Sequence, residues 1–165
     1  MAAIGQGLAV FIEKPIASNS LEAAQLQQAA RSAGVLLQIG LVLRYEASHA
    51  LLREEVALGH FGELVSIRVK RNCSRHWASK YLHRCPTVFE TLIHDIDLMI
   101  WFSSSRAQIV MAMERPARNY FHSEAVAALN RFSNGTLGMA ESSWYIPANA
   151  PKNVVANDWN GTIDS

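Results

Sequence analysis

Two short apolar runs near the N-terminus constrain this sequence more than any other feature. They span residues 7–12 and 35–43, and neither alternates with polar residues, which is the pattern of strands buried on both faces. Between them, Asn19 with Glu22 three residues later predicts the start of a helix, and Gly34 predicts its end. Strand, helix and strand in this order predict a right-handed βαβ unit with parallel strands.

One helix and two parallel strands cannot cover both faces of a sheet, so we expect this unit to be part of a doubly wound domain, truncated on its N-terminal side. No Gly-x-Gly-x-x-Gly motif occurs in the sequence. Gly5 and Gly7 precede the first strand instead of following it, and this context predicts a turn rather than a dinucleotide fingerprint.

After residue 45 the pattern changes to that of an α+β domain. We expect helices at 47–58 and 88–102, separated by a half-buried strand at 64–70 and a polar loop at 72–86. Further strands are predicted at 109–113, 125–132, 137–144 and 154–159. Asn134-Gly135 and Asn160-Gly161 predict hairpin turns, and a short last arm that leaves a sheet edge exposed suggests that C-terminal strands are missing. The fold class is therefore α/β to α+β, a parallel βαβ followed by a predominantly antiparallel open sheet with helices on one face.

Composition excludes several classes of protein. Among 165 residues only 18% are charged, and the net charge of +1 lacks the basic excess of a nucleic-acid-binding protein. No apolar run approaches the roughly 20 residues of a membrane helix, and the first residues do not form a signal peptide. Two cysteines are too few for a disulfide framework. We therefore expect a cytoplasmic protein that binds neither membrane nor nucleic acid.

Two segments carry residues suited to catalysis. Lys14, between Glu13 and Pro15, follows the first strand, at the edge where open parallel sheets bind ligands, although a solvated lysine is the simpler interpretation. The helix at 88–102 is apolar on most of its surface yet contains Glu90, His94, Asp95 and Asp97. Charges in an apolar surround need partners or a ligand, so this helix predicts either an acid–base site or a buried ion-pair network.

The loop at 72–86 offers two weaker signals. Cys73, His76, His83 and Cys85 are zinc-ligand types, but their spacing is not that of paired zinc ligands, and we predict no metal site. Trp77 and the nearby Tyr81 are able to stack on a sugar or a nicotinamide ring, or simply to pack in the core.

These motifs resemble those of the Gfo/Idh/MocA family of NAD(P)-dependent oxidoreductases, which act mostly on sugars, inositols and related polyols. Residues 9–15, ending in Glu-Lys-Pro, are similar to its strand motif, and Glu90-x-x-x-His94-Asp95-x-Asp97 is similar to its Asp-x-x-x-His helix. The resemblance covers nearly the whole chain. It implies that residues 1–45 are the remnant of a dinucleotide-binding Rossmann domain and that 46–165 form a substrate-binding and oligomerisation domain.

The resemblance also implies roles for individual residues. Lys14 would lie near the nicotinamide and the substrate hydroxyl, His94 would accept the proton, and Glu90 would replace the family's substrate-binding Asp. The cofactor-binding residues would be Glu13, Lys14, Pro15 and Gly40, with NAD or NADP as cofactor. The substrate-binding residues would be Lys14, Arg44, Trp77, Glu90 and His94.

The departures from the family pattern shape the remaining expectations. Glu90 and the segment 85–89 differ from the residues usual in the family, so the identity of the substrate is not determined. Because the chain lacks the glycine-rich phosphate loop, we expect it alone to bind NAD(P) poorly and to be inactive. A sheet with helices on one face only predicts a homo-oligomer, a dimer or tetramer, through the other face. The alternative is a non-catalytic ligand-binding or oligomerisation module of the same fold.

Overall fold

The chain forms two compact units, residues 1–42 and 43–165. The structure is a computed structural model that describes residues 1–147, 149–150 and 160–164. Each unit is built around its own sheet, the first with two strands and the second with five.

The first unit is the predicted βαβ. Strand β1 (Val10–Ile12) pairs in parallel with β2 (Leu37–Ile39), and α2 (Ser20–Ala33) connects them, preceded by the short α1 (Ala2–Gly5). The Asn19 side chain accepts a hydrogen bond from the Glu22 backbone N–H at 2.9 Å, and Gly34 closes the helix with φ +65°. Both predicted helix boundaries are therefore confirmed, because each depends on a contact local in sequence.

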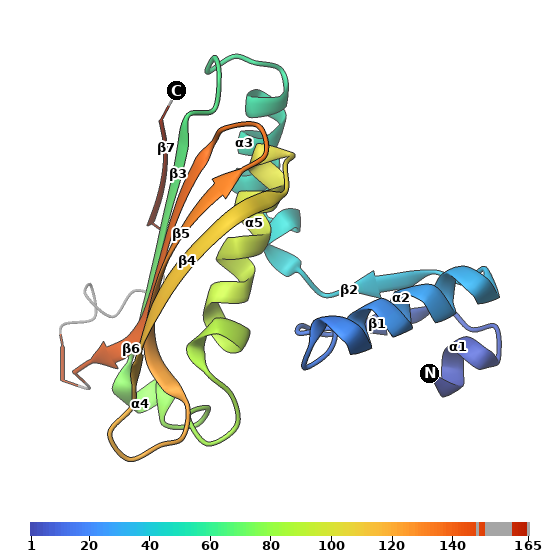
Figure 1. Ribbon diagram of the computed structural model, residues 1–165, viewed down its shortest axis with the longest axis horizontal. Coiled ribbons are helices and arrows are strands. Elements are labelled where there is room, and N and C mark those ends of the chain that lie inside the picture. Colours follow the sequence, from blue (N-terminus) through green and yellow to red (C-terminus); the bar gives the residue numbers. More distant parts are fainter. Residues whose placement is uncertain (148, 151–159, 165) are drawn as a thin grey trace. The chain divides into compact units, whose positions relative to one another are not determined.

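The second unit places helices against one face of a mixed sheet (Figure 1). After a 3-10 turn, Val42–Tyr45, come α3 (Ala47–Ala57), β3 (Ser66–Ser74), α4 (Arg75–Ala78), a π-helical turn (Val88–Leu92) and α5 (Ile93–Ser103). Strands β4 (Ala107–Pro116), β5 (Ser123–Phe132), β6 (Leu137–Ile146) and β7 (Asn160–Asp164) follow. The strand order is β4-β5-β6-β3-β7, with only the β3–β6 pair parallel.

The predicted fold class is confirmed, but some predicted elements differ. The loop expected at 72–86 contains the end of β3 and the helix α4. Asn134-Gly135 forms the expected turn between β5 and β6, but Asn160-Gly161 does not form a turn. It begins β7, in which Gly161 is paired with Val69 of β3, so a pairing distant in sequence overrides the local turn preference. The predicted strand at 154–159 lies outside the described residues. The predicted helix at 88–102 is present, but its first turn is π-helical.

The core of the second unit lies between the sheet and α5. Its fully buried side chains include Ile67 and Val69 of β3, Leu98 and Phe102 of α5, and Phe132 of β5. Alternate residues of β3 are buried and exposed from Ile67 to Lys70, which is the half-buried strand that the sequence predicts. The five-stranded sheet thus supports α5, the helix that carries His94, Asp95 and Asp97.

Candidate functional site

In the first unit, the candidate residues meet at the carboxyl edge of the β1–β2 pair. The Gly40 backbone N–H donates to the Ile12 carbonyl oxygen at 2.8 Å, which holds Gly40 beside the last residue of β1. A Cβ atom at Gly40 would lie 2.8 Å from Glu13 Oε2, so the glycine leaves the space that the Glu13 side chain needs. The Lys14–Pro15 peptide bond is cis. Glu13, Lys14, Pro15 and Gly40 therefore share one edge of this small sheet.

This edge fits the nicotinamide end of a dinucleotide. A carboxylate at the carboxyl ends of parallel strands is able to accept hydrogen bonds from ribose hydroxyls, and a side chain larger than glycine at position 40 would displace it. Lys14 follows Glu13 directly in sequence and adds a positively charged residue to this segment. The chemistry of these donors and acceptors thus agrees with the predicted cofactor-binding set, whose contacts with a cofactor stay a prediction.

In the second unit, the most buried charge of the helix has an internal partner. Asp95 of α5 is 0% exposed, and both of its carboxylate oxygens accept hydrogen bonds from Arg71 of β3, at 2.8 and 2.9 Å. Burial raises the pKa of Asp95 even though the Arg71 guanidinium opposes the shift. A buried, bidentate pair of this kind holds α5 against the sheet and leaves Asp95 unavailable to a ligand.

The Asp97 carboxylate is engaged in the same way, nearer to solvent. Arg44 Nε donates to Asp97 Oδ2 at 2.7 Å and its NH2 group donates to Oδ1, while the guanidinium lies 5.6 Å from the centroid of the Trp101 ring. The hydrogen bonds to Asp97 raise the pKa of Arg44. Arg44, predicted to bind substrate, is thus already held in a bidentate ion pair, and any contact with substrate stays a prediction.

Glu90 and His94 are the remaining titratable groups of this helix. Glu90 lies in the π-helical turn and His94 is the second residue of α5, and both are half-buried. Asp95 and Asp97 are held by arginines, whereas the acid–base roles expected for His94 and Glu90 stay predictions. Of the two predicted alternatives for the helix, the structure shows ion pairs at Asp95 and Asp97, and the acid–base site stays a prediction.

A hydroxyl cluster that the sequence analysis missed is centred on Thr91, the residue after Glu90 in the π-helical turn. Thr87, Thr91 and Ser142 of β6 contact one another through their hydroxyl oxygens at 2.7 to 2.9 Å, and all three residues are buried. Trp144 Nε1 donates to Thr91 Oγ1 at 3.2 Å. The only signal in the sequence was a pair of threonines four residues apart in an otherwise apolar helix.

The aromatic residues of the 72–86 loop form a packed cluster. The rings of Trp77 and Tyr81 are 4.5 Å apart, and Trp77 meets the fully buried Trp144 edge to face at 5.7 Å. Cys73 is buried in the same cluster. Among the described residues, no group of three or more His, Cys, Asp or Glu side chains is arranged to hold a metal ion. This packing favours the simpler interpretation of Trp77, whose contact with substrate stays a prediction.

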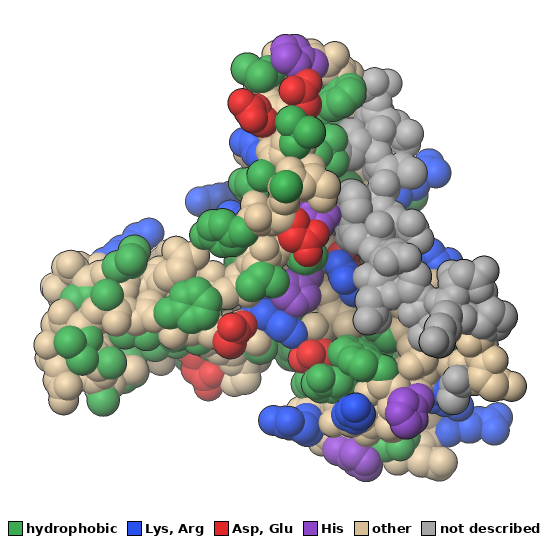
Figure 2. Space-filling model, turned by 180° about the vertical axis from the view of Figure 1, so that it is seen from behind, with side chains coloured by type: hydrophobic (Ala, Val, Ile, Leu, Met, Phe, Trp, Pro, Cys, Tyr) green, Lys and Arg blue, Asp and Glu red, His purple; other side chains and the backbone are tan. Residues whose placement is uncertain are grey.

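Basic side chains gather at the end of the second unit that carries α4 (Figure 2). Residues 75–84 and 115–122 contain no acidic residue, and the rings of His83 and Tyr120 join the two segments at 4.7 Å. The buried Glu124 carboxylate lies 3.6 Å from Arg75 and 3.4 Å from Arg115. One carboxylate between two arginines leaves a net positive field at this end, which attracts anions.

No helix in the described part of the chain has the length and apolarity required to cross a membrane. This finding covers residues 1–147, 149–150 and 160–164.

Comparison with known proteins identifies relatives of both units. The family model described as GFO/IDH/MocA C-terminal domain matches residues 49–162, and the model described as oxidoreductase family, NAD-binding Rossmann fold, matches residues 1–41. Inositol 2-dehydrogenase of Salmonella typhimurium is 29% identical over 105 residues, which are 61% of this chain and 30% of that protein. The 1,5-anhydro-D-fructose reductase of Ensifer adhaerens is 39% identical over 69 residues, 42% of this chain and 21% of that protein. The chain spans about a third or less of the length of these relatives.

Solved structures share the fold at low sequence identity. A putative oxidoreductase from Thermotoga maritima aligns with a TM-score of 0.82 and 17% identity over 99% of this chain and 52% of its own. Myo-inositol 2-dehydrogenase from Lactobacillus plantarum aligns with a TM-score of 0.78 and 20% identity over 88% of this chain and 46% of its own. GenD2 from gentamicin A biosynthesis, solved in complex with NAD, aligns with a TM-score of 0.77 and 23% identity over 90% of this chain and 44% of its own.

Proposed function

Because the chain belongs to the GFO/IDH/MocA oxidoreductase family, as its motifs predict, we propose that it is the catalytic and substrate-binding part of an NAD(P)-dependent dehydrogenase. The proposed substrate is an inositol, a sugar or a related polyol. Relatives named inositol 2-dehydrogenase and 1,5-anhydro-D-fructose reductase support this substrate class.

The proposed chemistry is the oxidation of a secondary alcohol to a ketone. A nicotinamide held by Glu13, Lys14, Pro15 and Gly40 would supply the acceptor for the hydride that leaves the carbinol carbon. His94 takes the hydroxyl proton, since an imidazole changes its charge near neutral pH. The Lys14 ammonium stabilises the negative charge that develops on the substrate oxygen, and the Glu90 carboxylate accepts a hydrogen bond from a neighbouring hydroxyl.

One observation carries the assignment of the acid–base residue. Asp95 and Asp97 are both engaged by arginines through two hydrogen bonds each, and proton transfer from either carboxylate would break an ion pair that anchors the helix. His94 directly precedes Asp95 in sequence, so the Asp95–Arg71 ion pair fixes the backbone next to it. A base held in this way keeps its orientation toward a substrate.

The test uses a polypeptide in which a glycine-rich dinucleotide-binding segment precedes this chain. We expect it to form NADH or NADPH with an inositol or another polyol. His94→Gln should reduce kcat about 10²- to 10⁴-fold and Lys14→Met about 10²-fold or more. His76→Gln, at an exposed histidine of α4, is the matched control and should leave kcat unchanged.

Two outcomes would change this proposal. Full activity of His94→Gln would remove His94 from the chemistry. A polypeptide that binds no nicotinamide cofactor would support the alternative, a non-catalytic module of the same fold.

For the 165-residue chain alone we propose weak or no NAD(P) binding, because it contains no Gly-x-Gly-x-x-Gly segment to hold the pyrophosphate. Binding calorimetry with NAD and NADP tests this point.

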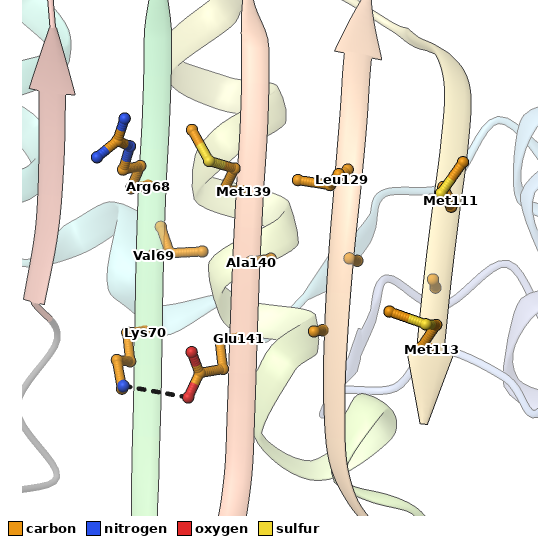
Figure 3. A pocket seen from close by; sticks show the side chains of 12 residues that line it. Arg68, Val69, Lys70, Met111, Met113, Leu129, Met139, Ala140 and Glu141 are labelled. Carbon is orange, nitrogen blue, oxygen red and sulfur yellow. Dashed lines mark ion pairs between the residues drawn. The ribbon is translucent and has the colours of Figure 1, made fainter. Parts of the chain in front are cut away.

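We further propose that the open face of the five-stranded sheet associates with a second copy of the chain. Two rows of side chains cross this face (Figure 3), and the strand registers align them as Arg68, Met139, Leu129, Met111 and as Lys70, Glu141, Ala127, Met113. They border a shallow hollow of about 440 Å³. Met113 is 75% exposed, Met111 66% and Leu129 55%, an apolar group of a kind that usually marks an interface.

The charges of this face favour a copy of the chain as the partner. Arg68 and Lys70 lie on one side and Glu141 lies beside Lys70, so a two-fold axis through the face is able to set basic groups of one copy against Glu141 of the other. Light scattering should therefore give a dimer or tetramer, and Met113→Glu should shift it toward monomer. Phe121→Glu, at a loop residue that is 95% exposed, is the control and should leave the mass unchanged. A strictly monomeric wild type would contradict this proposal.

The two cysteines bear on the compartment. Neither Cys73 nor Cys85 is part of a disulfide, which is typical of a reducing environment, and we propose that the protein acts in the cytoplasm. Cell fractionation tests this proposal.

A further inference from the structure

The hydroxyl cluster of Thr87, Thr91 and Ser142 is bonded both to the indole of Trp144 and to the backbone of the helix. Trp144 Nε1 has no acceptor capacity and donates to Thr91 Oγ1. The Thr91 hydroxyl donates in turn to the Thr87 carbonyl oxygen at 2.9 Å. The Thr87 and Ser142 hydroxyls, 2.9 Å apart and each within 2.8 Å of Thr91 Oγ1, complete the cluster. Loss of the Thr91 hydroxyl would remove the acceptor of the buried Trp144 N–H.

This cluster coincides with the π-helical turn. The Ile93 N–H donates to the Val88 carbonyl oxygen, five residues earlier, which is the π-helical register. A threonine hydroxyl bonded to the carbonyl four residues earlier, as Thr91 is to Thr87, is known to bend a helix. The partners of this turn reach into the sheet, since Ser142 and Trp144 belong to β6, between β5 and β3. The irregular turn is therefore held by contacts more than fifty residues away in sequence.

The position of the π-helical turn affects two residues of the candidate site, Glu90 and His94. Glu90 lies inside the turn and His94 follows it in the regular helix. In an uninterrupted α-helix these residues would share one stripe, but the wider turn rotates Glu90 relative to His94. We propose that Thr87, Thr91 and Ser142, with Trp144, are positioning residues that set the angle between Glu90 and His94, and thereby the orientation of the substrate.

The expected effect on substrate rests on the proposed function, whereas the expected effect on the π-helical turn rests on geometry alone. Two measurements therefore test the two effects separately. Thr91→Val keeps the shape of the side chain and removes the hydroxyl, whereas Thr91→Ser keeps the hydroxyl. Thr136→Val is the matched control, because Thr136 is equally buried and loses one bond, to the Leu64 carbonyl oxygen at 2.8 Å, elsewhere in the sheet.

The first measurement is amide hydrogen exchange of Ile93 by NMR in the 165-residue chain. We expect exchange to be about tenfold faster or more in Thr91→Val and close to wild type in Thr91→Ser and Thr136→Val. Equal acceleration in Thr91→Val and Thr136→Val would indicate general destabilisation and overturn the inference.

The second measurement is steady-state kinetics in the polypeptide that includes the glycine-rich segment. Thr91→Val should raise KM for the polyol about tenfold with a much smaller change in kcat, since misplacing a binding group weakens contact with substrate before it affects the proton acceptor. Thr91→Ser should restore the wild-type KM. An unchanged KM in Thr91→Val, in an active enzyme, would overturn the inference. A wild type without dehydrogenase activity would overturn the proposed function instead, and the exchange of Ile93 would then decide the inference.

Discussion

The two faces of the five-stranded sheet hold charge in opposite ways. Lys70 and Arg71 are neighbours in β3, and strand geometry turns them to opposite faces. On the face covered by α5, Arg71 makes two hydrogen bonds to Asp95, and the arginine side chain is only 13% exposed. On the open face, Lys70 Nζ lies 3.2 Å from Glu141 Oε1 in a single ion-pair contact, and both side chains are about half exposed.

This difference separates two tasks. The covered face contains directional contacts, both ion pairs and hydroxyls, that leave each group one geometry. The open face presents methionines and leucine, which are flexible and adapt to a partner surface. We infer that the covered face keeps the candidate catalytic groups in place and that the open face serves association with a partner. The strengths of the ion pairs on the two faces test this inference.

The largest effect is expected at Asp95. Asp95→Ala leaves the buried Arg71 guanidinium unpaired, which should lower the free energy of unfolding by about 3–5 kcal/mol. Denaturant unfolding followed by circular dichroism measures this change. The double variant Arg71→Met with Asp95→Leu removes both charges and should recover most of the loss, because burial already disfavours the charged pair. A loss below about 1 kcal/mol in Asp95→Ala would show that water reaches the covered face.

A second prediction concerns the reactivity of Cys73, also on the buried side of β3. Burial raises the pKa of Cys73 to about 11, so the side chain stays a neutral thiol through the physiological range. Near pH 9 its thiolate fraction is about fiftyfold lower than that of an ordinary cysteine, and alkylation should be slower at least in proportion. Mass spectrometry of native and denatured protein measures the two rates.

The sign of the associated pH effect follows from the raised pKa. The stability that the neutral Cys73 thiol contributes is present below the ordinary thiol pKa and is lost as the pH rises through about 11. Unfolding of Cys73→Ala should therefore depend less on pH in the alkaline range than unfolding of the wild type. Rapid alkylation of native Cys73 at pH 9 would contradict the buried placement.

Features with local causes were predictable from the sequence. Asn19 and Gly34 bound α2 through contacts within four residues, and Asn134-Gly135 turns the chain between two strands adjacent in sequence. Asn160-Gly161 carries the same turn signal but enters β7, because its pairing partner is β3. The dipeptide alone does not distinguish these outcomes.

The sequence allowed the types of the candidate site residues to be predicted, but not the residues with which they form ion pairs and hydrogen bonds. The four charges of an apolar helix indicated either ion pairs or chemistry, and choosing between them required Arg71, 24 residues from Asp95, and Arg44, 53 residues from Asp97. The π-helical turn depends on Ser142, which is further still from Thr87. Such contacts follow from the tertiary fold and have no periodic signature in the sequence.

A smaller effect is expected at Asp97. Its partner Arg44 is 36% exposed, so water screens part of the interaction, and Asp97→Ala should lower the free energy of unfolding by about 1 kcal/mol. The same denaturant experiment checks this value. A loss as large as that of Asp95→Ala would show that the helix is anchored equally at both aspartates. The contribution of each ion pair to stability would then not depend on how deeply it is buried.

The smallest effect is expected on the open face, at Lys70. In a monomer the pair with Glu141 is exposed, and Lys70→Ala should change the free energy of unfolding by at most about 0.5 kcal/mol. If a second copy covers this face, the pair is removed from water, and the cost of Lys70→Ala should then grow with protein concentration. Unfolding of wild type and variant over a hundredfold range of concentration distinguishes these cases. A cost that is large at every concentration would mean that the open face holds charge as rigidly as the covered face, and the division of tasks between the two faces would be wrong.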